Sequence, residues 1–254
     1  MRYFLQCAYN GTPYHGWQVQ PGVPTVQQVL NESLSKLLRQ PIAVIGAGRT
    51  DTGVHARQMV AHFDGESIGD RRDFLYRVNA LLPPSIAVRS ICEVSGKAHA
   101  RFSALSRTYR YYITREKDPF QTETAYQLQS MRLDVKRMNR AADLLLRCGD
   151  FSSFSRSGSD TAQHICALTQ AFWFEMGERL IFEVTANRFL RNMVRALVGT
   201  LLDVGMGKRS VAEFEEVIAQ KDRGQAGVSA PARGLFLERI RYPEEICPNL
   251  IKKG

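Results

Sequence analysis

The sequence predicts an α+β fold, in which helices pack on a mixed and largely antiparallel sheet. Strand-like segments alternate with amphipathic helical segments in both halves of the chain, and some strand-like segments are near neighbours, as in hairpins. The 254 residues, of which 44% are hydrophobic, are enough to form one large domain or two small ones. There is no strict sequence repeat, but the order of elements is similar in the two halves.

The first half is predicted to contain a series of strands and two helices. Segments that alternate apolar and polar residues, or that are rich in β-branched residues, indicate strands. They lie at residues 2–9, 42–45, 59–63 and 86–94. Thr25 can cap a helix with a regular apolar face. A second helix is expected from Asp70 to Leu82, where the two following prolines end it.

The second half is predicted to repeat this alternation. Strands are expected at residues 108–113, 165–175, 180–186 and 235–242, and helices at 138–149, 190–201 and 210–220. On the helix over 190–201, Arg191 and Arg195 are four residues apart and lie on the margin of the apolar face. Such an arginine usually extends its stem over apolar surface and leaves its charge in water.

The charge of the chain predicts a polyanionic partner. There are 34 Lys and Arg against 25 Asp and Glu, which gives a net charge of +9. Residues 97–115 contain no acid, and the strand over 108–113 interleaves tyrosines with a base. The basic residues of this segment are Lys97, Arg101, Arg107, Arg110 and Arg115. The pattern suits contacts with RNA phosphates and bases, and it also fits a sheet whose tyrosines pack inward.

Cysteine usage and hydropathy predict a soluble, cytoplasmic protein. The five cysteines, Cys7, Cys92, Cys148, Cys166 and Cys247, form no C-x-x-C pair and are odd in number, which favours free thiols in a reducing compartment. No apolar stretch is long enough for a membrane span, and the N-terminus lacks a signal-peptide core. Because there is no Gly-rich phosphate loop and no Cys/His ligand spacing, we expect no cofactor and no metal.

Residues 46–56, Gly-Ala-Gly-Arg-Thr-Asp-Thr-Gly-Val-His-Ala, connect two predicted strands and are the centre of the functional prediction. Three glycines allow positive φ angles and close approach of another molecule. Arg49 and Asp51 bring a base and an acid onto one loop, and loops on rigid strands are where sites are commonly built. The alternative is a tight turn in which Asp51 accepts from its own backbone, but such a turn has no need of Arg49 or His55.

Within this loop, Gly-Arg-Thr-Asp followed by Gly-Val-His-Ala resembles the signature of the tRNA pseudouridine synthases that modify uridines in the anticodon arm. Further segments similar to that family follow in the expected order at residues 9–18, 100–104, 150–154, 192–195 and 232–235. The resemblance implies two related α/β halves, 1–100 with the Asp loop and 101–254, that share one sheet and flank a basic cleft. It also implies tRNA as the partner, uridines 38, 39 and 40 as targets, and a homodimer.

The resemblance also implies roles for individual residues. Asp51 is expected to be the nucleophile, which attacks C1′ or C6 of the nucleoside. Arg195 is expected to pair with Asp51 and keep it anionic. Tyr109 is expected to stack on the uracil, and to act as or orient the base that removes the C5 proton. Arg49 is expected to fill the space left by the flipped uridine. Independently of the resemblance, the basic segment over 97–115 predicts that Lys97, Arg101, Arg107 and Arg110 bind the RNA.

One position departs from the family pattern, in which alanine is common where this chain has Thr52. The resulting Asp51-Thr52-Gly53 is also the aspartic-protease tripeptide, but that chemistry requires two carboxylates sharing a proton, and this chain has a single copy beside Arg49. A non-catalytic RNA-binding protein is the main rival prediction, because charge and aromatic residues fit it equally well. Pseudouridylation of another RNA is a third reading. The histidines expected to be structural or to contact RNA are His55, His62 and His99.

Overall fold

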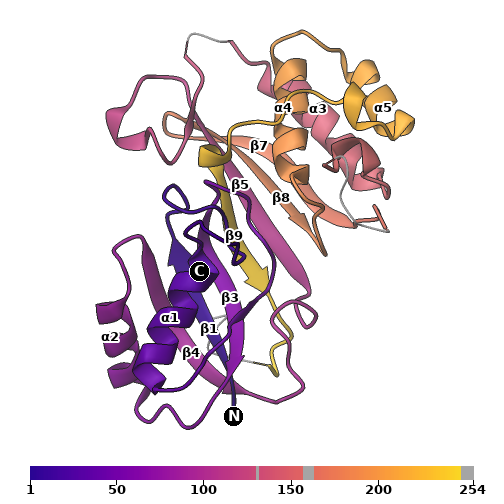
Figure 1. Ribbon diagram of the computed structural model, residues 1–254. Coiled ribbons are helices and arrows are strands. Elements are labelled where there is room, and N and C mark those ends of the chain that lie inside the picture. Colours follow the sequence, from indigo (N-terminus) through magenta and orange to yellow (C-terminus); the bar gives the residue numbers. More distant parts are fainter. Residues whose placement is uncertain (130–131, 157–162, 247–254) are drawn as a thin grey trace. The chain divides into compact units, whose positions relative to one another are not determined.

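The computed structural model describes residues 1–129, 132–156 and 163–246 (Figure 1). The chain divides into two compact units. The first consists of Met1–Arg107 together with the C-terminal segment that begins at Leu237, and the second consists of Thr108–Phe236. Each unit contains strands and helices of its own.

The first unit is built on antiparallel strands. β1 (Arg2–Tyr9) lies between β3 (His55–Asp64) and β4 (Ile86–Val94) and pairs antiparallel with both. The two-residue β2 (Ile45–Gly46) also pairs antiparallel with β3. The last strand, β9 (Leu235–Arg241), is the next neighbour of β3. Strands close to those predicted over 2–9 and 86–94 are therefore confirmed.

Two helices lie over the strands of the first unit (Figure 1). α1 (Val26–Leu38) begins after Thr25, whose side chain accepts a hydrogen bond from the Gln28 amide. α2 (Arg71–Leu81) begins after Asp70, whose carboxylate accepts from two amides of the first turn. The two helices contact each other, and α2 packs on β4. Both predicted helices are confirmed.

The second unit also has mostly antiparallel strands. β8 (Arg179–Ala186) lies between β5 (Ser106–Thr114) and β7 (Leu168–Met176). β7 and β8 pair antiparallel, whereas the short β6 (Tyr126–Gln127) runs parallel to β5. In the second half of β5, successive residues from Tyr111 to Thr114 are buried, so both faces of the strand are covered there.

Three helices pack together in the second unit (Figure 1). They are α3 (Val135–Leu144), α4 (Met193–Gly205) and α5 (Val211–Gln220). α3 contacts β7 and both other helices, and most of α4 is buried. Short 3-10 helices lie at Pro119–Gln121, Leu145–Arg147, Ser152–Phe154, Arg223–Gln225 and Ala232–Gly234. Mostly antiparallel strands with helices packed on them confirm the predicted α+β class.

The predicted strand over 42–45 is wrong in extent, because only its last residue belongs to β2. Side chains of α1 bind the backbone of this segment instead. Ser35 Oγ accepts from the Ile42 amide and Asn31 Oδ1 accepts from the Val44 amide, each at 2.8 Å. Since these donors are already satisfied, the segment needs no strand partner to bury its backbone.

The predicted helix over 190–201 starts later than expected. Its first helical residue is Met193, because Asn192 adopts a left-handed conformation with φ of 63°. Arg191 therefore precedes the helix, and Arg195 lies in its first turn. This shift separates two arginines that the periodicity placed on one helix margin.

The cysteines only partly match the expectation of free thiols. Cys7, Cys148 and Cys166 are free, and burial raises the pKa of the Cys7 thiol to about 12. Cys92 is disulfide-bonded, so the expectation is wrong for that residue. Cys247 lies outside the described residues. Among the helices that the structure describes, none is long and apolar enough to cross a membrane.

Candidate active site

The Asp51 loop, defined as residues 47–54, runs from the end of β2 to the start of β3. Its stem residues Ala47, Thr50 and Val54 are buried, whereas Arg49 is exposed and Asp51 is half-buried. The loop therefore has a buried frame and presents its two charged side chains at or near the surface.

The N-terminal segment after β1 holds one side of this loop. The Trp17 amide donates to the Thr50 carbonyl at 3.1 Å, and the Gly53 amide donates to the Tyr14 carbonyl at 3.4 Å. The hydroxyls of Tyr9 and Thr50 share a hydrogen bond of 2.9 Å. These bonds fix the backbone on both sides of Asp51.

Glycine is required where this segment touches the loop. A Cβ on Gly11 would lie 2.0 Å from the Val54 carbonyl oxygen, and one on Gly16 would lie 2.4 Å from the Thr50 carbonyl oxygen. Gly16 also has a φ of +87°, which L side chains rarely adopt. The two backbones thus approach more closely than any side chain would allow.

Arg107 and β3 hold the other side of the loop. The Ala47 amide donates to the Val60 carbonyl at 2.8 Å. The Arg107 guanidinium donates to the Ala47 carbonyl at 3.2 Å. Since bonds to the backbone are made before and after Asp51, this frame holds the backbone of the loop at that residue.

The three histidines predicted as structural or RNA-contacting accept backbone hydrogen bonds. His55 Nδ1 accepts from the Gly11 amide at 3.1 Å, and His62 Nδ1 accepts from the Ala100 amide at 3.2 Å. His99 Nδ1 accepts from the amide that follows it by two residues. Burial lowers the pKa of His62 to about 4, and His99 and Arg2 act in the same direction. A neutral, structural His62 follows from this geometry.

In the second unit, Arg195 is tied to the segment that follows the last helices. Its Nε donates to the Ala230 carbonyl at 2.7 Å, and the Ala230 amide donates back to the Arg195 carbonyl at 2.9 Å. Arg195 is half-buried in the first turn of α4. A cation at this end of a helix is not stabilised by the helix dipole, so the bonds to Ala230 hold the Arg195 side chain in place.

Tyr109 and Tyr111 lie on one face of β5 but differ in environment. Tyr109 is half-buried and its ring meets Phe189 edge-on, with centroids 5.1 Å apart. Tyr111 is fully buried and donates its hydroxyl to the Pro231 carbonyl at 2.8 Å. Burial raises the pKa of Tyr111, although Arg195 and Arg233 oppose the shift. Tyr109 is thus the member of this pair with surface left for a ligand.

The burial of two tyrosines weakens the rival reading of a stacking platform. Tyr111 is 0% exposed, and Tyr112 is 3% exposed and packs edge-on against Phe236. Neither ring can stack on an RNA base without unpacking the core of the unit. The sequence left open whether the tyrosines of this strand pack inward or contact RNA. In the structure, Tyr111 and Tyr112 pack inward.

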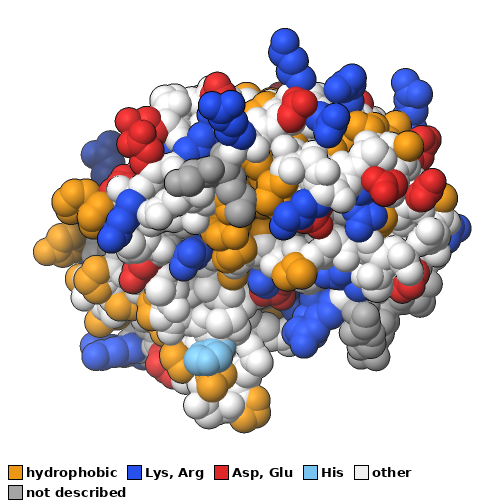
Figure 2. Space-filling view, turned by 90° about the horizontal axis from the view of Figure 1, so that it is seen from above, with side chains coloured by type: hydrophobic (Ala, Val, Ile, Leu, Met, Phe, Trp, Pro, Cys, Tyr) orange, Lys and Arg blue, Asp and Glu red, His pale blue; other side chains and the backbone are white. Residues whose placement is uncertain are grey.

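Three of the predicted RNA-binding residues, Lys97, Arg101 and Arg110, differ in environment. Lys97 and Arg101 are exposed in the first unit. Arg110, in the second unit, pairs with Glu183 at 2.6 Å, and its guanidinium lies over the Phe174 ring. On the face drawn in Figure 2, basic side chains are interspersed with acidic ones rather than gathered in one unbroken patch.

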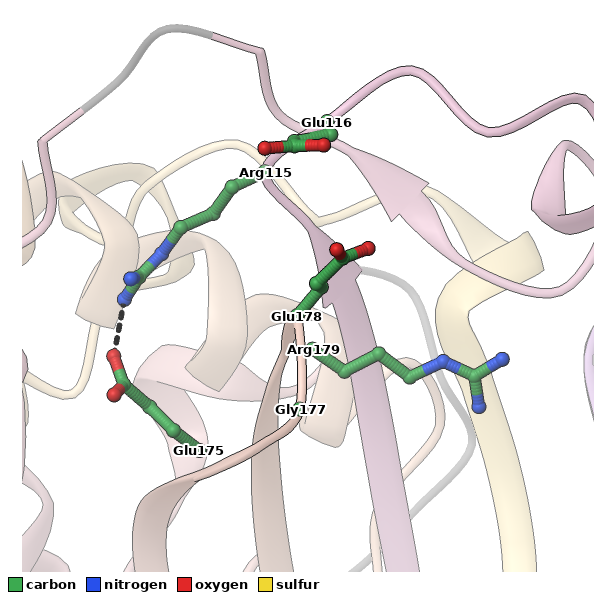
Figure 3. A pocket seen from close by; sticks show the side chains of 6 residues that line it. All are labelled: Arg115, Glu116, Glu175, Gly177, Glu178 and Arg179. Carbon is green, nitrogen blue, oxygen red and sulfur yellow. Dashed lines mark hydrogen bonds and ion pairs between the residues drawn. The ribbon is translucent and has the colours of Figure 1, made fainter.

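The pocket drawn in Figure 3 does not suit a phosphate. It is lined by Arg115, Glu116, Glu175, Gly177, Glu178 and Arg179. Arg115 donates to Glu175 at 2.7 Å, and two further carboxylates face the same hollow (Figure 3). Glutamates outnumber arginines there, so an anion would be repelled. Among the described residues, no group of three or more His, Cys, Asp or Glu could hold a metal ion.

Sequence patterns did not reveal the long-range contacts made by the residues around the candidate site. The Tyr9 hydroxyl binds the side-chain hydroxyl of Thr50, 41 residues away, and His55 and Tyr111 bind backbone atoms 44 and 120 residues away. Local periodicity carries no signal for such contacts. Asp51 and Arg49 belong to the first unit, and Tyr109 and Arg195 to the second.

Comparisons with known proteins cover both units. A family model described as tRNA pseudouridine synthase matches residues 7–103 and 141–243. The chain is 50% identical over 256 residues to the tRNA pseudouridine synthase A of Bacteroides thetaiotaomicron, with 100% of this chain and 95% of that protein covered. It is 48% identical over 250 residues to the Porphyromonas gingivalis protein of that name, with 96% and 98% covered. For the Chlorobaculum tepidum protein of that name, identity is 39% over 239 residues, with 94% and 96% covered.

Proposed function

The chain belongs to the tRNA pseudouridine synthase family, and we propose that it converts uridine to pseudouridine at positions 38, 39 and 40 of the tRNA anticodon stem-loop. The family makes it an isomerase that acts on uridines of tRNA. The choice of uridines is supported by the sequence of the Asp51 loop, which resembles the signature of the tRNA pseudouridine synthases that modify uridines in the anticodon arm.

The reaction breaks the N1–C1′ bond, rotates the uracil and joins C5 to C1′, after which the C5 proton is released. C5 loses its proton to a base and N1 gains a proton from water, so the atoms and electrons balance, and neither an oxidant nor a reductant is consumed. We assign Asp51 as the nucleophile, because a carboxylate can add to an electrophilic carbon of the sugar or base. The addition falls on C1′ or on C6, and both routes end with loss of the C5 proton.

The observation that carries this proposal is the frame around the Asp51 loop. Bonds from Trp17 and Tyr9 to Thr50 restrain the residue immediately before Asp51, while Asp51 itself is half-buried. Fixing a nucleophile before the substrate arrives lowers the entropic part of the barrier. A simple turn aspartate would not need Gly11 and Gly16 packed against the backbone of its loop.

Two residues of the second unit complete the proposed chemistry. Arg195 pairs with Asp51 in this proposal and keeps the carboxylate anionic as the base excludes water. Its bonds to Ala230 hold its Nε in one orientation, which supports a directed role. Tyr109 stacks on the flipped uracil. Its hydroxyl either removes the C5 proton as the general base or orients the group that does so. Its half-buried ring supports this role.

Recognition of tRNA is assigned to exposed or partly exposed basic residues. Arg49 enters the space that the flipped uridine leaves, which its exposure on the loop supports. Lys97, Arg101 and Arg110 contact phosphates, so affinity should fall steeply with salt. A cytoplasmic homodimer completes the proposal. Its support is the family resemblance, and light scattering of the purified protein tests the dimer.

Chemical mapping of pseudouridine in tRNA transcripts tests the proposed targets. Transcripts would carry uridine at 38, 39 or 40 singly, and a matched transcript would carry none at these positions but keep its other uridines. We expect pseudouridine at each of the three positions and none in the matched transcript. Modification of other positions alone would refute the proposed target set.

A further inference from the structure

Arg107 makes an unusual number of contacts with backbone carbonyls. Its Nη1 donates to the Ala104 carbonyl at 3.1 Å. Its Nη2 donates to the Arg101 carbonyl at 2.6 Å and to the Ala47 carbonyl at 3.2 Å. Both protons of Nη2 are therefore engaged, and the side chain is half-buried. A phosphate could reach this nitrogen only by displacing bonds within the protein.

Two of those carbonyls belong to a well-anchored segment, residues 99–105. Ala100 donates its amide to His62 and accepts at its carbonyl from the Tyr242 hydroxyl. Ser103 and His99 are bonded to each other twice, at 2.9 and 3.0 Å. The Leu105 amide donates to the Arg241 carbonyl at 2.8 Å. We call this the anchor segment, because strands β3 and β9 and its own turn hold it in place.

The third carbonyl belongs to Ala47, the first residue of the Asp51 loop. Arg107 thus bridges the anchor segment and the Asp51 loop. Arg107 and Ala47, which are joined by a hydrogen bond, lie 60 residues apart in the sequence. The geometry points to Arg107 as a positioning residue that fixes the entry of the Asp51 loop, rather than as an RNA contact. This inference rests on the proposed function of the loop, and it replaces the phosphate-binding role that the sequence predicts for Arg107.

The shape of the side chain explains why arginine is needed. A planar guanidinium directs several donors at once, whereas a lysine ammonium is a single point of charge on a flexible stem. Arg107→Lys keeps the positive charge but loses the planar arrangement of several N–H donors. An electrostatic RNA contact would be largely preserved by this change, and a three-carbonyl bridge would not.

Kinetics and tRNA binding of Arg107→Lys separate the two roles. We expect kcat to fall at least about tenfold while the Kd for tRNA and its salt dependence stay within about twofold of wild type. Arg101→Ala should instead raise Kd and reduce the slope of log K against log salt by about one. Arg57→Lys is the matched control, because Arg57 is exposed and pairs with Glu238 outside the loop. Its kcat should stay within about twofold of wild type.

Hydrogen exchange tests the bridge independently of activity. In Arg107→Lys and Arg107→Gln, amides of the Asp51 loop should exchange faster while β1 and β4 stay as protected as in wild type. A wild-type kcat in Arg107→Lys, or unchanged exchange in the loop, would overturn the inference. If the wild-type protein formed no pseudouridine, the proposed function would be refuted. The exchange data would still decide whether Arg107 holds the Asp51 loop in place.

Discussion

The hydroxyls of Tyr9 and Thr50 lie 2.9 Å apart and share a buried hydrogen bond, which joins the last residue of β1 to the residue before Asp51. The Tyr9 ring also contacts Trp17, with centroids 6.0 Å apart, and Trp17 packs so closely on Gly46 that a Cβ there would clash. Contacts of the aromatic side chains Tyr9 and Trp17, in addition to backbone pairing, therefore hold the loop against the sheet.

Replacing Tyr9 by phenylalanine tests this connection. The change removes one hydroxyl and leaves Thr50 Oγ1 buried without that partner, which should cost about 1–3 kcal/mol of stability. We expect kcat to fall with little change in tRNA affinity, because the loop loses its restraint while the basic residues are untouched. Urea unfolding and single-turnover kinetics measure the two effects. Full activity in Tyr9→Phe would show that this bond does not position Asp51.

Gly11 provides a test of backbone contact. In Gly11→Ala the new Cβ would lie 2.0 Å from the Val54 carbonyl oxygen, so the two segments must separate. We expect a loss of several °C in Tm together with lower kcat. Gly96→Ala is the matched control, since nothing lies within 4 Å of its Cβ position. Equal Tm values for the two variants would contradict the close approach.

Stability should fall as the pH is lowered from about 6.5 to about 4. The folded-state pKa of His62 is about 4 against an ordinary value of 6.5, so the unfolded chain binds a proton that the folded chain excludes. His62 alone accounts for roughly 3 kcal/mol between pH 7 and pH 4. His99 has a lowered pKa and adds to the loss. Urea unfolding of His62→Gln should show a shallower pH dependence, and an unchanged slope would rule out His62 as its source.

Tyr109 should contribute through its ring as well as its hydroxyl. Tyr109→Ala removes stacking worth about 1–3 kcal/mol, so kcat/KM should drop at least about fivefold. Tyr109→Phe keeps the ring and its edge-on contact with Phe189, and should bind tRNA like wild type. Comparing tRNA affinity and C5 proton release in both variants separates the two contributions. An Ala variant with wild-type kcat/KM would exclude the stacking role.

Elements with a local signal could be predicted from the sequence. The cap at Thr25 and a regular apolar face mark α1, and the two prolines after Leu82 mark the end of α2; both helices form close to where they are expected. The Asp51 loop could be singled out from its glycines and its acid–base pair. These features depend on neighbours within a few residues, so they are visible in one sequence.

Features that depend on distant segments could not be predicted. The strand over 42–45 was lost to side chains of α1, and the start of α4 was moved by the left-handed Asn192. The charge of Arg107 resembles that of an RNA contact, and only the fold brings Ala47, 60 residues away, to its guanidinium. For the same reason Tyr111 and Tyr112 could not be told apart from stacking residues by alternation alone.

The central claim, that Asp51 is the nucleophile of a tRNA pseudouridine synthase, is tested most directly by tritium release from tRNA labelled at uracil C5. Asp51→Asn keeps the size of the side chain and removes its charge. We predict release by wild type and none by Asp51→Asn, while both bind tRNA with similar Kd. Release by Asp51→Asn at a rate close to wild type would contradict the account and leave Asp51 as a turn residue.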